Sequence, residues 1–195
     1  MSQANFSLCV YCGSRIGVRP AYKALARELG QSIARRNWQL VYGGGRAGLM
    51  GELADSVLSS GGRVVGVIPE SLMRLEVGHA GLTELHVVQT MHQRKQMMAE
   101  RSDAFVAMPG GIGTFEELFE VWTWRHLGYH DRPIGLLDVE SYWQPLVEFL
   151  SRSCDEGFMN AKQMAMLRTD GDVDQLLDWL SSQPAARHGF ELKQI

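Results

Sequence analysis

Short, continuous apolar runs, separated by longer stretches of helical period, constrain the fold of this chain most strongly. The runs Arg63–Ile68 and Ala104–Met108 carry apolar side chains at nearly every position. A strand that exposes one face to water alternates apolar and polar residues, whereas a strand covered on both faces does not. Parallel strands need crossover connections, and these cover both faces of a sheet with helices. The pattern therefore predicts a parallel sheet between two helical layers.

Six strands and six helices are predicted in alternation. The strands are expected at Ser7–Cys12, Gln39–Tyr42, Arg63–Ile68, Glu84–Val88, Ala104–Met108 and Pro133–Leu137. The helices, which repeat apolar residues at intervals of three or four, are expected at Pro20–Arg36, Gly48–Ser60, Met91–Arg101, Thr114–His126, Tyr142–Glu156 and Val173–Ser182. This order is typical of an α/β fold that is Rossmann-like and doubly wound, with a mainly parallel sheet and helices on both faces. Since no linker or repeat divides the chain, we expect one domain over residues 1–183 and a tail over residues 184–195.

The charge balance and hydropathy narrow the range of partners. The chain has 19 basic and 22 acidic side chains and a formal net charge of −3, which gives no broad basic surface for nucleic acid or an anionic membrane. No apolar run approaches the roughly 18 residues of a membrane span, and the first residues lack the basic and apolar regions of a signal peptide. We therefore expect a cytoplasmic protein without nucleic-acid or membrane partners, and any anion site must be local.

Neither a disulfide framework nor a metal site is expected. Cys9 and Cys12 form a C-x-x-C pair, but in a strand their side chains would point to opposite faces. A redox motif would sit at a helix N-terminus, and a structural zinc site would need a second ligand pair, so we expect buried, reduced cysteines, with Cys154 unpaired. A glycine between His126 and His130 interrupts the helix that would bring both imidazoles to one metal ion. These are expected to be loop histidines.

Glycine is over-represented, with 21 of 195 residues, against an average usage of about 7%. Eight glycines gather in two strand-to-helix turns, at the edge where open α/β sheets bind ligands: Gly43, Gly44, Gly45, Gly48, Gly51, Gly110, Gly111 and Gly113. In the first turn, Gly43, Gly45 and Gly48 match the G-x-G-x-x-G spacing of dinucleotide-binding proteins. The same glycines could instead serve only a tight turn and close helix packing, and the turn follows the second strand rather than the first.

The second glycine turn, Met108–Glu117, follows the most apolar strand and precedes an amphipathic helix. Glycines at three positions would let the backbone approach a phosphate, with the N–H groups of the helix start directed at the anion and the Thr114 hydroxyl as a further donor. The alternative is a capping box, in which Thr114 caps the helix and Glu117 reaches back to it. The pattern alone favours neither interpretation.

A cation lies on an apolar helical stripe in the segment Met91–Met98. Arg94 shares one face with Met91 and Met98, at spacings of three and four residues. A buried arginine needs an anion, and a phosphate or Glu117 would be the natural partner. Alternatively, Arg94 extends to a solvated edge and Lys95 is an ordinary surface charge.

The segments Pro109–Glu117 and Met91–Lys95 together resemble the paired signature of the LOG ("Lonely guy") family. Tyr11–Ser14 and Tyr42–Gly51 add to this resemblance, which covers roughly Phe6 to Leu180. It implies a Rossmann-like fold, a homodimer and no metal or redox cofactor. The implied activity is that of a cytokinin riboside 5'-monophosphate phosphoribohydrolase, which cleaves the N-glycosidic bond of an adenine-type nucleotide to give free base and ribose 5-phosphate.

The resemblance also implies roles for individual residues. Arg94 and Glu117 become the catalytic pair, in which the Glu117 carboxylate activates water and stabilises the ribosyl cation while Arg94 holds Glu117 and the substrate. The implied substrate-binding positions, besides Arg94, are Ser14, Gly44, Glu76, Lys95, Gly110, Gly111, Ile112, Gly113 and Thr114. Arg15 stands where many relatives have a serine, which could alter contacts near the 5'-phosphate.

Three other functions compete with this one. A noncatalytic nucleotide-binding or carrier protein could use the same two turns. An NAD(P)-dependent oxidoreductase would account for the spacing of Gly43, Gly45 and Gly48 but lacks an obvious substrate domain. Proteins of this family have also been labelled lysine decarboxylases, yet a pyridoxal phosphate enzyme needs a Schiff-base lysine, and only Lys95 is near the expected site.

Overall fold

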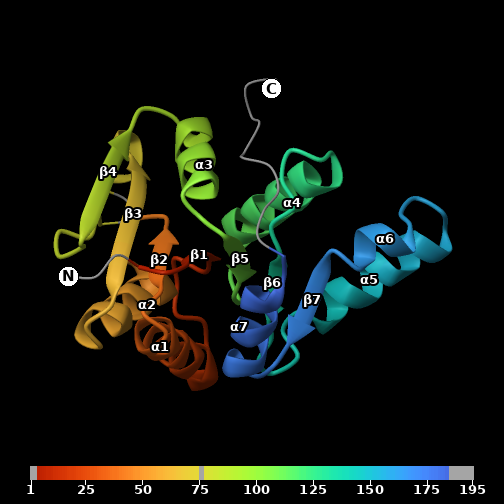
Figure 1. Ribbon diagram of the computed structural model, residues 1–195, viewed down its shortest axis with the longest axis horizontal. Helices are drawn as coiled ribbons and strands as arrows, with labels where there is room; N and C mark the ends of the chain where they lie inside the picture. The colour runs from red at the N-terminus through yellow and green to blue at the C-terminus, as the bar shows by residue number, and fades with distance from the viewer. Residues whose placement is uncertain (1–3, 75–76, 185–195) are drawn as a thin grey trace.

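Seven parallel strands form a single sheet. The computed structural model describes residues 4–74 and 77–184 (Figure 1). The strands are β1 (Ser7–Tyr11), β2 (Gln39–Tyr42), β3 (Arg63–Pro69), β4 (Glu84–Val88), β5 (Ala104–Ala107), β6 (Ile134–Leu137) and β7 (Leu167–Asp170). Their order across the sheet is β4-β3-β2-β1-β5-β6-β7, and every neighbouring pair is parallel. The predicted α/β fold is confirmed, and within the described residues the sheet is wholly parallel.

Helices cover both faces of the sheet, as the apolar strands predicted. The helices are α1 (Pro20–Arg35), α2 (Gly48–Ser59), α3 (Met91–Glu100), α4 (Ile112–His126), α5 (Gln144–Asp155), α6 (Ala161–Met164) and α7 (Val173–Ser182), with a short 3₁₀ turn, η1 (Glu70–Leu72). Side chains from α1, α2 and α7 pack with Leu8 and Val10 on one face, and those from α3, α4 and α5 pack with Cys9 and Tyr11 on the other. Figure 1 shows α1 and α2 on one side of the strands and α3 and α4 on the other.

The prediction that the Cys9 and Cys12 side chains point to opposite faces of the sheet is confirmed. Cys9 packs in the core layer beneath α3 and α4, whereas Cys12 packs in the layer beneath α1 and α2. Both are buried, and none of the three cysteines, all of which lie in the described residues, forms a disulfide. Burial raises the pKa of the Cys9 thiol, which keeps it protonated and unreactive.

The edge strand β7 and helix α6 were missed from the sequence. The β7 sequence, Leu-Arg-Thr-Asp, has one apolar residue, because this strand pairs only with β6 and lies at the sheet edge. Arg168 is hydrogen bonded to Asp170 at 2.8 Å and lies over the Trp179 ring, so its charge is accommodated locally. Polar edge strands of this kind carry no continuous apolar run for a pattern to detect.

Two helix starts differ from the prediction, and both differences affect the ligand-binding edge. Helix α4 begins at Ile112, two residues earlier than expected. Helix α5 begins at Gln144, two residues later, because Glu140 and Ser141 adopt left-handed backbone angles of φ 57° and 56°. Tyr142 therefore lies outside the helix. Of the expected tail, residues 185–195 lie outside the described residues, and the single-domain boundary stays a prediction.

No helix in residues 4–74 and 77–184 combines the length and apolar character needed to cross a bilayer. Within the same residues, no group of three potential metal ligands gathers. His126 ends α4, and His130 lies beyond it, in the loop before β6.

The neutral imidazole of His130 stabilises the turn between α4 and β6 through two hydrogen bonds. Its Nε2 lies 2.9 Å from the Val121 carbonyl oxygen, and its Nδ1 accepts a hydrogen bond from the Arg132 N–H at 3.1 Å. Since a carbonyl only accepts, the proton sits on Nε2 and the lone pair on Nδ1 is used. Burial lowers the pKa of His130 to about 4. Protonation would therefore oppose the native hydrogen bonding.

We expect His130 to make the protein sensitive to mild acid. The unfolded chain, with the ordinary pKa of 6.5, binds more protons than the folded one between pH 6.5 and about 4. The contribution of His130 to stability is full above pH 6.5 and is lost as the pH falls toward 4, by up to about 3 kcal/mol. Urea unfolding at stepped pH should therefore give a flatter pH dependence for His130→Gln than for the wild type. Exposed His92 supplies the control, since His92→Gln should keep the wild-type slope.

Candidate active site

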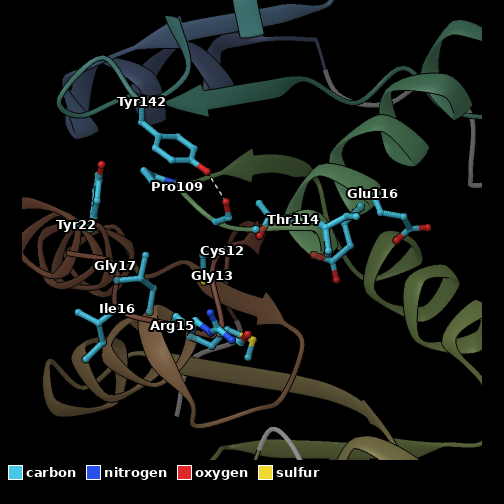
Figure 2. Close-up of a pocket in the computed structure, with 18 of the residues that line it drawn as sticks. Cys12, Gly13, Arg15, Ile16, Gly17, Tyr22, Pro109, Thr114, Glu116 and Tyr142 are labelled. Carbon is cyan, nitrogen blue, oxygen red and sulfur yellow. Dashed lines mark hydrogen bonds between the residues drawn. The ribbon is translucent and has the colours of Figure 1, made fainter. Parts of the chain in front are cut away.

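A pocket of about 600 Å³ opens at the point where the strand order reverses (Figure 2). β1 and β5 are neighbours in the sheet, but the chain continues from β1 toward β2 and from β5 toward β6. The loops that leave their carboxyl ends diverge, and a crevice forms between them. The loop after β1, Cys12–Gly17, forms one wall, and the second glycine turn with the start of α4, Pro109–Thr114, forms another. The predicted ligand-binding edge thus holds a pocket.

The second glycine turn presents an uncapped helix N-terminus to this pocket. Gly111 is the N-cap residue of α4, and no side chain in the described residues caps it. Thr114 is the third helical residue and is 3% exposed, so the predicted capping box with Glu117 does not form, and that interpretation is wrong. The first N–H groups of a helix have no intrahelical acceptor, and the helix dipole adds partial positive charge there. The arrangement is suited to an anion.

Packing inside the protein explains glycine at one of the three positions of this turn but not at the other two. A Cβ on Gly110 would lie 2.1 Å from the Thr114 hydroxyl oxygen and 2.9 Å from the Gly13 nitrogen, so the fold itself requires glycine there. A Cβ on Gly111 or Gly113 would meet no atom within 4 Å. Neither residue has a left-handed backbone angle. Packing within the chain therefore does not account for these two glycines, whereas close approach of a ligand would.

Arg94 is a buried cation at the side of the pocket. It is 3% exposed, its Nε donates to the Val67 carbonyl at 3.1 Å, and one terminal nitrogen donates to the Gly43 carbonyl at 2.7 Å. The other terminal nitrogen lies 3.8 Å from the Met91 sulfur. The alternative, in which Arg94 extends to a solvated edge, is therefore wrong. Because a guanidinium stays protonated in proteins, the site keeps a fixed positive charge.

Glu117 lines the same pocket as Arg94, so the two side chains expected to form the catalytic pair are brought to one cavity. It lies three residues after Thr114, which places both on one face of α4. The side chain is half-buried. Burial, with a smaller contribution from the Glu117 charge, raises the pKa of Tyr11 beneath it. Tyr11 therefore stays neutral.

The glycines of the first turn serve the fold and do not line the pocket. A Cβ on Gly43 would lie 2.1 Å from Arg94, and one on Gly48, at φ +62°, would lie 2.2 Å from the Ser14 backbone. Gly44, at φ +76°, packs against Ile68 and is not among the residues that line the pocket. Contacts inside the protein thus account for Gly43 and Gly48 of the G-x-G-x-x-G spacing. The turn acts on the site indirectly, through the Gly43 carbonyl that holds Arg94.

The remaining predicted residues divide into three groups. Ser14, Ile112 and Thr114 line the pocket together with the glycines of the second turn. Lys95 does not line it, because its ammonium group contacts Glu116 at 2.6 Å and Glu120 at 2.9 Å. Burial lowers the pKa of Lys95, but hydrogen bonds to these carboxylates outweigh it and leave the pKa above its ordinary value. Glu76 lies outside the described residues.

Sequence reasoning missed two aromatic residues of the pocket, Tyr22 and Tyr142. Their rings meet edge to face, with centroids 5.9 Å apart, and the Tyr142 hydroxyl donates a hydrogen bond to the Gly110 carbonyl (Figure 2). Burial raises the pKa of the Tyr142 hydroxyl. The available signal was positional, since the first strand of a doubly wound sheet also ends at the switch point and its loop leads into α1.

The fold and the pocket together define a Rossmann-type α/β protein with an uncapped helix N-terminus and a carboxylate in one pocket. A family model described as "possible lysine decarboxylase" matches residues 50–180. A cytokinin riboside 5'-monophosphate phosphoribohydrolase of Rhodococcoides fascians is 54% identical over 169 residues, which is 86% of this chain and 85% of that protein. An Arabidopsis thaliana protein of the same name is 42% identical over 194 residues, covering 96% and 91%. The chain belongs to the LOG family of phosphoribohydrolases.

Solved structures share the fold at lower sequence identity. A molybdenum cofactor binding protein from Rippkaea orientalis superposes with a TM-score of 0.69 at 20% identity, covering 93% of this chain and 98% of that one. The Moco carrier protein of Chlamydomonas reinhardtii gives a TM-score of 0.67 at 22% identity, covering 90% and 94%. At this identity the likeness establishes the architecture alone.

The pocket does not fit the decarboxylase chemistry in the family model's description. Pyridoxal phosphate is held through a Schiff base to a lysine. Among the described residues no lysine lines the pocket, Lys95 is held by two carboxylates, and Lys23 contacts Glu52 at 2.6 Å. The described residues that line this pocket therefore do not fit that cofactor.

Proposed function

We propose that this enzyme hydrolyses the N-glycosidic bond of adenine-type nucleoside 5'-monophosphates, namely AMP, cytokinin riboside 5'-monophosphates or both. The products are free base and ribose 5-phosphate. One observation carries the proposal: a single pocket holds an uncapped helix N-terminus, two glycines without an internal packing role, and the Glu117 carboxylate. An anion-binding turn and a carboxylate in one cavity suit a substrate with a phosphate at one end and a scissile bond nearby. The names of the relatives support the same chemistry.

The chemistry follows from charge development at the sugar. As the bond between C1' and the base nitrogen breaks, its electron pair leaves with the base, which takes up a proton from solvent, and C1' becomes an oxocarbenium-like cation. The Glu117 carboxylate stabilises this cation and accepts a proton from the water that attacks C1'. Arg94, fixed by two backbone carbonyls, supplies positive charge that holds anionic groups in place. Binding of the phosphate at the start of α4 holds the end of the substrate that is remote from the scissile bond, and this positions C1' for attack.

Apolar side chains give the pocket a surface for a flat base. Ile16, Leu72 and Met91 line it together with Leu49 and Met50 from the start of α2. These side chains offer dispersion contacts and no charge, which suits a neutral purine ring. The proposal therefore assigns the base to this apolar side and the phosphate to the glycine turn.

The reaction is tested by incubating the protein with AMP, isopentenyladenosine monophosphate, other nucleotides and unphosphorylated nucleosides. Free base and ribose 5-phosphate are measured by chromatography. The proposal predicts turnover of adenine-type monophosphates and little turnover of nucleosides. Equal rates on nucleosides would show that the phosphate does not anchor the substrate. Tight nucleotide binding without base release would favour a noncatalytic carrier protein.

Gly113→Ala should raise the stability of the protein and, at the same time, weaken its binding of the substrate. Gly113 occupies the second helical position of α4, and a Cβ there meets no atom of the chain within 4 Å. Alanine in place of glycine should therefore raise the free energy of unfolding by about 0.5–1 kcal/mol. The methyl group would occupy space that we assign to the phosphate, so KM for AMP should rise about ten- to a hundredfold through weakened charge-assisted hydrogen bonds. Urea unfolding and steady-state kinetics measure the two effects.

Gly110→Ala provides the contrasting variant. Its Cβ would lie 2.1 Å from the Thr114 hydroxyl oxygen, so this substitution should destabilise the fold. If Gly113→Ala kept the wild-type KM, the phosphate would not lie against the start of α4.

We further propose that the enzyme acts as a homodimer in the cytoplasm. Helix α4 exposes Phe119, and Leu127 directly after it is 57% exposed, which offers apolar area for contact with a second copy. The three cysteines form no disulfide within the described residues, which suits a reducing compartment. Sedimentation velocity reports the assembly.

A further inference from the structure

We infer that Tyr142 is a positioning residue for the anion site, because its hydroxyl sets the orientation of the peptide that joins Gly110 to Gly111. The inference rests on the proposed function only for the identity of the anion as the substrate's phosphate. The hydroxyl of Tyr142 donates a hydrogen bond to the Gly110 carbonyl (Figure 2). Tyr142 reaches this turn from the segment between β6 and α5.

The geometry of a peptide unit connects that hydrogen bond to the ligand side of the turn. The carbonyl of Gly110 and the N–H of Gly111 belong to one planar, trans unit, so they point in opposite directions. Holding the carbonyl toward Tyr142 therefore aims the Gly111 N–H away from Tyr142. Beside Gly111 the structure has open space, since a Cβ there would meet no atom within 4 Å. This N–H is one of the donors available to an anion at the start of α4.

A peptide between two glycines needs such a restraint. With no Cβ on either side, both backbone orientations are accessible at low cost, so this unit can flip between presenting its N–H and presenting its carbonyl. A carbonyl turned toward the phosphate would repel it. The Tyr142 hydrogen bond selects the orientation that donates, and it does so before the ligand arrives.

The segment that carries Tyr142 is itself held in an uncommon conformation. Glu140 and Ser141 have φ angles of 57° and 56°, in the left-handed region that non-glycine residues rarely adopt. Glu140 pairs with Arg19 of the loop before α1, and the Trp143 N–H donates to the Asp138 carboxylate at 3.0 Å. These contacts end β6 and delay the start of α5, which leaves Tyr142 outside the helix and directed at the glycine turn. Strain that surrounding contacts maintain is common where a side chain must be placed accurately.

The test is Tyr142→Phe, which keeps the ring contacts with Tyr22 and Trp143 and removes only the hydroxyl. Loss of one hydrogen bond should weaken binding of ribose 5-phosphate and inorganic phosphate by about three- to tenfold. KM for the monophosphate should rise by a similar factor while kcat changes less. Binding of the unphosphorylated nucleoside, measured by calorimetry, should stay unchanged. In an ¹⁵N–¹H spectrum, the Gly111 amide should shift more than amides elsewhere.

Tyr129→Phe is the matched control, because Tyr129 packs beside the core beneath α4 and does not line the pocket. It should leave phosphate binding unchanged. If Tyr142→Phe binds phosphate as tightly as the wild type, or weakens nucleoside and phosphate equally, the positioning role is wrong while the proposed function stands. If the wild-type protein itself binds neither ribose 5-phosphate nor phosphate, the failure lies in the proposed function.

Discussion

Glu117→Gln should reduce kcat for base release by about a hundred- to ten-thousandfold, the range expected when a general base is removed. The amide has nearly the shape of the carboxylate but carries no negative charge and takes no proton from water. It therefore loses both the stabilisation of the ribosyl cation and the activation of the nucleophile. Binding of ribose 5-phosphate should change little, because we assign the phosphate to the glycine turn. Rapid-quench or steady-state kinetics with AMP, paired with calorimetry of product binding, separates the two effects.

Glu120→Gln is the matched control on the same helix. Glu120 lies one turn further along α4, contacts Lys95 at 2.9 Å and does not line the pocket. Its loss should leave kcat within a few-fold of the wild type. Comparable losses in the two variants would show that general weakening of α4, rather than the carboxylate at position 117, lowers the rate.

Arg94→Met should be the most damaging substitution to stability at this site and should also abolish activity. Methionine fills much of the volume but leaves the carbonyls of Val67 and Gly43 without their buried donors. Each unsatisfied buried acceptor costs about 1–3 kcal/mol, so we expect the two carbonyls to lower the free energy of unfolding by about 2–6 kcal/mol. Urea unfolding measures the loss, and the base-release assay measures activity.

The Arg94→Lys variant tests whether the site needs only a positive charge at position 94 or also the shape of the guanidinium group. A lysine keeps the charge but cannot reproduce the flat, forked donor that contacts both carbonyls. We therefore expect intermediate stability and low activity. Arg101→Met, at the exposed end of α3, should change stability by less than about 0.5 kcal/mol. Wild-type stability in Arg94→Met would contradict the anchoring role.

The sequence was most informative where one interaction dominates. The strand β2 and the helix α7 match their predicted bounds, because β2 is buried from Leu40 to Tyr42 and α7 buries one apolar face. The edge strand β4 also matches, although Val88 is the one buried residue of its five. The buried Arg94 was recognisable from its apolar neighbours on the helix. The polar edge strand β7 was not, because its place depends on pairing with β6 rather than on its own pattern.

The candidate site could be predicted only in part, because some of its features depend on residues distant in sequence. The second glycine turn could be found from spacing, yet its capping box was wrong because α4 starts two residues earlier and buries Thr114. Whether a glycine serves packing or a ligand depends on neighbours distant in sequence. Gly43 is explained by Arg94 and Gly48 by Ser14, while Gly113 has no such neighbour. Tyr142 was missed because two left-handed residues shift the start of α5.

The pairing of β1 with β5 has a consequence for how the enzyme matures. Leu8 of β1 pairs with Ala104 of β5, 96 positions later in the chain. The partner of β1 on its other side, β2, is much closer to it in the sequence. The pocket lies between the loops that follow β1 and β5, so it cannot exist before that long-range pairing forms. Closing a long loop is entropically slow, and non-local pairing retards folding. During synthesis or refolding, catalytic activity should therefore emerge only after β1 and β5 have paired, and a nascent chain that ends before β5 would lack the pocket.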